Sequence, residues 1–142
     1  MRERYLFKNS KIPMWVNVVQ GILTLIMLQQ VFMFTFDHQA VNASGISIDG
    51  MPNQNLLYEF AGRTMVMAVA SIFVLATQNP RYFLVVLLMN IFREGFETII
   101  NPLFPLENAP ITPTADLIAH LIIVVIEVWA FITVLKIVRK VD

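Results

Sequence analysis

The stretch "ADLIAHLIIVVIEVWAFITVLKI", residues 115 to 137, gives the clearest indication of the fold class. A helix that crosses a lipid bilayer needs about 20 mostly apolar residues, and this stretch is long enough and almost continuously apolar. The residues in it that can carry a charge are Asp116, His120, Glu127 and Lys136. The stretch therefore predicts a membrane-spanning helix with a small number of polar positions.

Three further stretches have the same character and cover residues 13–36, 56–77 and 81–100. The chain is 57% hydrophobic and 14% charged, whereas a soluble domain carries about 25% charged residues. Its 142 residues suit a single domain over 1–142. We expect an all-α integral membrane protein, a four-transmembrane-helix bundle, whose first span is an uncleaved anchor because its apolar part exceeds that of a signal peptide.

Basic residues are distributed unevenly over the segments that connect the predicted spans. The longer connectors, at 37–55 and 101–114, contain no Lys or Arg. Outside the spans or at their ends, the basic residues are Arg2, Arg4, Lys8, Lys11, Arg81, Lys136, Arg139 and Lys140. Because cytoplasmic segments are enriched in Lys and Arg, we expect the N and C termini and the connection near residue 79 in the cytoplasm, in a bacterial cytoplasmic (inner) membrane.

Capping and breaking residues predict where the spans begin and end. Asn79 and Thr112, each followed by proline, are suited to start the third and fourth helices. Pro102 should end the third helix. The segment "GISIDGMP", residues 45–52, alternates apolar and polar residues around Asp-Gly, which predicts a small hairpin in the first long connector.

Charged side chains recur inside the predicted spans, most densely in "NIFREGFETII", residues 90–100. At about 100° per residue, the polar side chains of this segment fall on one face of a helix. Polar stripes in membrane helices face the bundle interior or a partner. The predicted polar cluster comprises Glu59, Arg63, Asn90, Arg93, Glu94, Glu97, Asp116, His120 and Glu127.

The depth of these residues predicts a site in the outer half of the bundle. With a rise of about 1.5 Å per residue, the members that fall in the outer half are Glu59, Arg63, Arg93, Glu94, Glu97, Asp116 and His120. Glu127 falls near the middle of the bilayer. A carboxyl group at that depth is either neutral and hydrogen-bonded to a neighbouring helix, for which Asn17 and Gln20 are candidates, or carries protons. The other charged members should contact one another.

The charges of the cluster are either a structural ion-pair network that fixes the register of the helices or a functional site, and as a functional site we interpret the cluster as binding a small or lipophilic ligand or an ion. Its arginines would hold anionic groups, and its carboxylates and His120 would accept protons or hydrogen bonds. Two other classes remain open: a non-catalytic accessory or assembly subunit of a larger membrane protein complex, and a proton-coupled transporter or channel subunit with a path past Glu127. The expected partners are the lipid bilayer and a homo-oligomer or larger complex, and the zero net charge does not favour nucleic acid.

A metal site and an enzyme active site are both weakly supported. Asp116 and His120 are four residues apart, and Glu94 and Glu97 could complete an oxygen-rich ligand set. However, the paired Glu-x-x-His motifs of di-iron helix bundles are missing, so we expect no metal. The sequence contains no hydrolase, nucleotide-binding or zinc-protease motif. It therefore identifies no catalytic residue and no cofactor, and does not favour an enzyme.

The segments "EFAGRTMVMAVA", residues 59–70, and "NIFREGFE", residues 90–97, together with the chain length and the connector after the first span, resemble the small four-helix membrane proteins of the DoxX-like group. The resemblance implies the same topology over the whole chain. The first span lacks a basic residue of the kind expected in that group. No residue role is therefore taken from it.

Overall fold

The protein is all-helical over the residues that its structure, a computed structural model, describes: 12–106 and 109–140. The helices are α2 (Met14–Phe36), α3 (His38–Ala43), α4 (Met51–Thr77), α5 (Pro80–Leu103) and α6 (Pro113–Arg139). These described ranges contain no β-strand. The predicted helical class is thus confirmed, whereas the basic residues at positions 2, 4, 8 and 11, used to predict the orientation, lie outside the described ranges.

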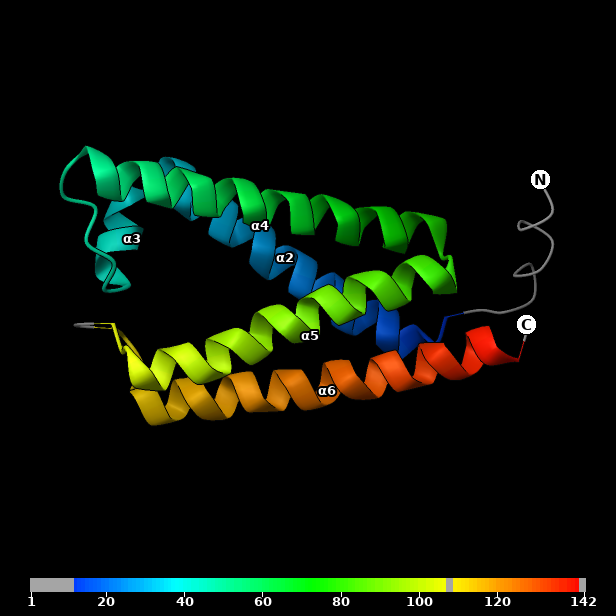
Figure 1. Cartoon of the computed structure of the whole chain (residues 1–142). Coiled ribbons are helices and arrows are strands. Elements are labelled where there is room, and N and C mark those ends of the chain that lie inside the picture. The colour runs from blue at the N-terminus through cyan, green and yellow to red at the C-terminus, as the bar shows by residue number, and fades with distance from the viewer. Residues whose placement is uncertain (1–11, 107–108, 141–142) are drawn as a thin grey trace.

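The four long helices form two pairs. Helix α2 packs mainly against α4, and α5 packs mainly against α6, with fewer contacts between α4 and α5. Figure 1 shows the pairs converging at the end where α4 turns into α5 and diverging at the end that carries α3. We call the first the closed end and the second the open end. The beginning of α2 and the end of α6 also lie at the closed end.

At the closed end, one apolar core joins all four long helices. Phe83 and Leu87 of α5 are completely buried there, and so is Val134 of α6. The buried members of this core are Ile12, Val16, Val74, Phe83, Val86, Leu87, Ala130 and Val134. Because the core takes residues from both helix pairs, it fixes the two pairs against each other.

At the open end, the buried apolar cluster belongs to one side of the molecule. It consists of Phe34, Val41, Leu57 and Ala61, which lie on α2, α3 and α4. Neither α5 nor α6 contributes a buried residue to it. Among the described residues, the two helix pairs therefore share no buried apolar cluster at this end.

The predicted starts of the third and fourth helices are confirmed by their caps. The Asn79 side chain accepts a hydrogen bond from the Arg81 backbone N–H at 3.0 Å. The Thr112 hydroxyl accepts one from the Ala115 backbone N–H at 3.3 Å. Each cap satisfies a donor that the first helical turn leaves without a partner, and each helix has proline in its first turn.

The predicted hairpin in the first long connector is wrong. Residues 46–49 form no strand, and α4 begins at Met51. Helix α3 precedes this segment, and the Asp37 carboxylate caps it by accepting a hydrogen bond from the Ala40 backbone N–H at 3.0 Å. Ile46 and Ile48, which suggested an alternating strand, pack against the open-end apolar cluster. Burial of these side chains replaces the strand pairing that a hairpin would need.

Two helix boundaries also differ from the prediction. Helix α4 starts at Met51, earlier than the predicted start at residue 56, because Pro52 occupies its first turn, where the missing N–H costs nothing. Helix α5 continues past Pro102 to Leu103. The chain leaves the helix immediately after this proline, so the prediction was in error by one turn or less.

Within the described ranges, three helices are long and apolar enough to cross a membrane: α2, α4 and α6. They indicate an integral membrane protein. Helix α5 does not meet the same criterion, since Arg93, Glu94 and Glu97 interrupt its apolar run.

Candidate ligand site between the helix pairs

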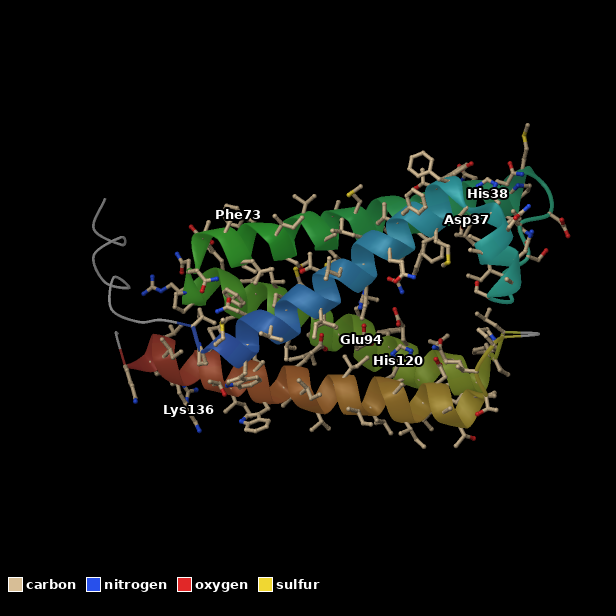
Figure 2. The ribbon with its side chains drawn as sticks, turned by 180° about the vertical axis from the view of Figure 1, so that it is seen from behind. Asp37, His38, Phe73, Glu94, His120 and Lys136 are labelled. Atoms are coloured by element: carbon tan, nitrogen blue, oxygen red, sulfur yellow. The ribbon has the colours of Figure 1, made fainter. Side chains whose placement is uncertain are left out.

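Glu94 lies at the centre of the charged residues and is almost completely buried, with 2% of its surface exposed. One carboxylate oxygen pairs with the Arg93 guanidinium. The other lies 2.7 Å from His120 Nδ1, and Figure 2 shows these two side chains next to each other on neighbouring helices. The Glu94 carboxylate thus connects α5 to α6 and is compensated by the guanidinium beside it.

His120 links Glu94 to the other carboxylates at the open end. Its Nδ1 lies 3.7 Å from Glu97 Oε2, and its Nε2 lies 3.5 Å from Asp116 Oδ1. Asn101 donates a hydrogen bond of 2.7 Å to the second Asp116 oxygen. The structure therefore brings Arg93, Glu94, Glu97, Asp116 and His120 together on the facing sides of α5 and α6, and we call these five residues the charged cluster.

Three of the four metal-ligand candidates meet within this cluster. Ligand atoms of Glu94, Glu97 and His120 all lie within 4.8 Å of one another, a separation that small side-chain movements could bring to metal-ligand distances. However, the Arg93 guanidinium already forms an ion pair with the Glu94 carboxylate. A positive charge at this position would oppose the binding of a metal ion. The described geometry fits an ion-pair network better than a metal centre.

A buried hydrogen-bond network connects the two helix pairs on the closed-end side of the charged cluster. Gln20 of α2 donates to the Ser71 hydroxyl of α4 at 2.9 Å and accepts from Asn90 of α5 at 3.4 Å. All three residues are at most 1% exposed. Asn90 therefore takes part in this network, while the charged cluster lies one turn further along α5.

Glu127 forms no hydrogen bond with Asn17 or Gln20 in the described structure, so the expected bond is not observed. It is completely buried, and neither carboxyl oxygen has a hydrogen-bond partner among the described residues. Asn17 instead bonds to Gln78, and Gln20 bonds to Ser71. The two expected partners of Glu127 thus form hydrogen bonds with other residues.

Glu59 and Arg63 do not contact the charged cluster in the described structure, so that expectation is wrong. They pair with each other along α4 at 3.1 Å, as residues four apart on a helix do. Their side chains are 53% and 76% exposed. A pair this open contributes little to stability, which leaves Arg63 available for contact with another molecule.

A cleft of about 790 Å³ opens between the helix pairs at the open end. Its walls come from α4 and α5, and Gln30 reaches it from α2. The lining residues are Gln30, Phe60, Arg63, Thr64, Met67, Met89, Phe92, Arg93, Phe96, Glu97, Ile100 and Asn101. A mostly apolar cleft of several hundred Å³ with a few polar groups is typical of a small-molecule site.

The sequence prediction missed the apolar walls of this cleft. Phe60, Arg63, Thr64 and Met67 are spaced so that they lie on one face of α4. The same spacing repeats on α5, from Met89 through Phe92, Phe96 and Ile100. Aromatic and Met stripes that also contain Arg would have indicated the cleft, but in a membrane helix they are also ordinary lipid-facing or packing residues.

Comparison with known proteins adds no relative. No protein-family model, no curated protein and no solved structure matches this chain. The resemblance to the DoxX-like group therefore stays a prediction from the sequence.

Proposed function

We propose that this membrane protein binds a lipophilic ligand with a polar head in the cleft between its two helix pairs. The observation that carries the proposal is the composition of the cleft, which combines aromatic and Met side chains with two guanidiniums from opposite walls. Apolar walls suit a hydrocarbon portion, and the convergent polar groups would fix its head.

The proposal includes a membrane topology in which α5 crosses the bilayer together with α2, α4 and α6. Helix α5 is 24 residues long and packs along α6, which would shield its charged face from lipid. Lys136, Arg139 and Lys140 lie at the closed end, which would face the cytoplasm of a bacterial inner membrane. The cleft would then open towards the outer leaflet.

The charged cluster would hold one wall of the cleft in position. Glu94 and His120 join α5 to α6, and Arg93 reaches the cleft from that wall. Arg63 reaches it from α4. Since these two walls share no buried apolar cluster at this end among the described residues, a ligand that contacts both arginines would stabilise the open end.

Arg63→Gln tests the proposal with little risk to the fold, because the Arg63–Glu59 pair is exposed. Delipidated protein in a maltoside detergent would be heated with and without added membrane lipid extract. The extract should raise the unfolding temperature of the wild type and raise that of Arg63→Gln much less. Lys136→Gln, at the other end of the molecule, is the control and should respond as the wild type does. Equal stabilisation of all three proteins would contradict the proposal.

A further inference from the structure

The order of the polar groups along the cleft narrows the class of ligand. Helices α4 and α5 run in opposite directions, so Met67 and Met89 lie on the side of the closed end, and Arg63 and Arg93 follow at the next turn. Glu97 lies one turn further towards the open end. Among the charged lining residues, the arginines therefore come first and Glu97 follows, and the apolar residues Phe60, Phe96 and Ile100 continue the wall on the open-end side of the arginines.

A phospholipid presents its groups in the same order. Its acyl chains point to the middle of the bilayer, its phosphate lies nearer the membrane surface, and its head-group alcohol lies beyond the phosphate. This order holds in either leaflet, so the comparison does not depend on which end of the bundle faces the cytoplasm. The apolar part of the cleft would receive acyl chain, and the arginines would meet the phosphate, which Arg binds through paired hydrogen bonds.

Glu97 distinguishes between head groups. It lines the cleft, and its side chain is 29% exposed, more than that of the neighbouring Glu94 at 3%. On α6, His120 lies 3.7 Å away and also contacts Glu94 and Asp116. The Glu97 carboxylate can therefore accept hydrogen bonds from a cationic group in the cleft.

The spacing of the two charges fits a short zwitterion. Residues four apart on a helix have Cβ atoms about 5–6 Å from each other, and Arg93 and Glu97 are four apart on α5. In an ethanolamine head group, a two-carbon linker separates the phosphate from the ammonium, so one head group could reach both side chains. A primary ammonium has three N–H donors for a carboxylate, whereas a trimethylated ammonium has none.

We propose that the cleft binds a phospholipid with a primary ammonium in its head group, with the phosphate between Arg63 and Arg93 and the ammonium at Glu97. This inference rests on the proposed function and adds the class of ligand. It also gives the two arginines and Glu97 separate roles, which can be changed independently.

The test is a lipid titration of delipidated protein, with bound lipid counted by native mass spectrometry. The probes are phosphatidylethanolamine, phosphatidylcholine and phosphatidylglycerol with identical acyl chains. The wild type should bind phosphatidylethanolamine about tenfold more tightly than the other two, since a charge-assisted hydrogen bond has about this effect. Glu97→Gln should remove the preference by weakening phosphatidylethanolamine and strengthening phosphatidylglycerol, whose negative charge no longer faces a carboxylate. Glu97→Asp, which keeps the carboxylate, should retain part of the preference.

Variants that act on other parts of the cleft separate the possible failures. Arg63→Gln should weaken all three lipids, and Met67→Trp should block all three by filling the apolar part. Equal binding of phosphatidylethanolamine and phosphatidylglycerol by the wild type, with both blocked in Met67→Trp, would overturn the head-group assignment and keep the proposed function. A preference for phosphatidylglycerol would do the same. Binding that Met67→Trp does not reduce would overturn both.

Discussion

The closed and open ends of this bundle use the same four long helices in different ways. At the closed end, α2, α4, α5 and α6 bury Phe83, Leu87 and their neighbours in a shared apolar core. At the open end, the buried apolar cluster is confined to α2, α3 and α4, and α5 and α6 are joined by Glu94 and His120. The first arrangement fills the space between the helix pairs with apolar side chains, whereas the second leaves a cleft with mostly apolar walls and a few charged and polar groups.

This difference indicates that the closed end stabilises the fold and that the open end can bind a ligand. Shape-complementary packing between helices is a principal source of stability in a membrane, where lipid is as apolar as the side chains. The closed end has this packing, and the open end replaces it with ion pairs and hydrogen bonds on one side of a cleft. We therefore expect substitutions at the closed end to change folding and those at the open end to change ligand binding.

The largest effect is expected for Phe83→Ala at the closed end. Phe83 is completely buried in the shared core, and removing a buried aromatic ring leaves a cavity that costs about 3–5 kcal/mol. Phe96→Ala is the matched control, because Phe96 lines the cleft and is 68% exposed. The free energy of unfolding in detergent would be measured for both. Equal destabilisation by the two substitutions would remove the distinction between the ends.

The second largest effect is expected for Glu94→Gln in the charged cluster. The change takes the carboxylate charge from a largely buried Arg93, and breaking such a pair costs about 3 kcal/mol. The double variant Arg93→Gln/Glu94→Gln should lose less stability than the sum of its single variants, because neither charge is left alone. Additive losses would show that the two side chains do not depend on each other.

A smaller effect, in the stabilising direction, is expected for Glu127→Leu. Glu127 is completely buried and its carboxyl oxygens have no partner in the described residues. Replacing an unsatisfied buried polar group by an apolar one should raise the free energy of unfolding by about 1 kcal/mol. Glu127→Gln, which keeps a polar group there, should show no gain. A loss of stability in Glu127→Leu would mean that the carboxyl group has a partner.

The smallest effect on stability is expected for Glu59→Gln. The exposed Glu59–Arg63 pair should contribute about 0.5 kcal/mol or less to the free energy of unfolding. A double-mutant cycle with Arg63→Gln would measure this coupling directly. A coupling several times larger would place the pair in the same class as the charged cluster and would argue against a mainly ligand-binding role for Arg63.

Helix class and inward polar faces could be predicted from the sequence, because both follow from local periodicity. The apolar run at 115–137 predicted α6, and Asn79 and Thr112 predicted the starts of α5 and α6. The spacing of Glu94 and Glu97 on α5 and of Asp116 and His120 on α6 predicted two polar faces, which the structure brings together.

The arrangement of partners could not be predicted, because it depends on how helices pair. Gln20 bonds to Ser71 rather than to Glu127, and Arg63 remains with Glu59 on its own helix. The division into α2–α4 and α5–α6 pairs, and hence the cleft between them, is a tertiary property. Likewise, Ile46 and Ile48 pack against the open-end apolar cluster instead of forming strands, and this packing is also a tertiary property.

Native mass spectrometry of protein extracted from its own membrane in mild detergent would show whether the cleft holds a ligand. Two variants of α4 should be compared with the wild type: Met67→Trp, which fills the cleft, and Met65→Trp, whose side chain is not among those that line it. We predict a reproducible added mass of lipid size on the wild type and on Met65→Trp, and its loss from Met67→Trp. The same added mass on all three proteins would contradict the account.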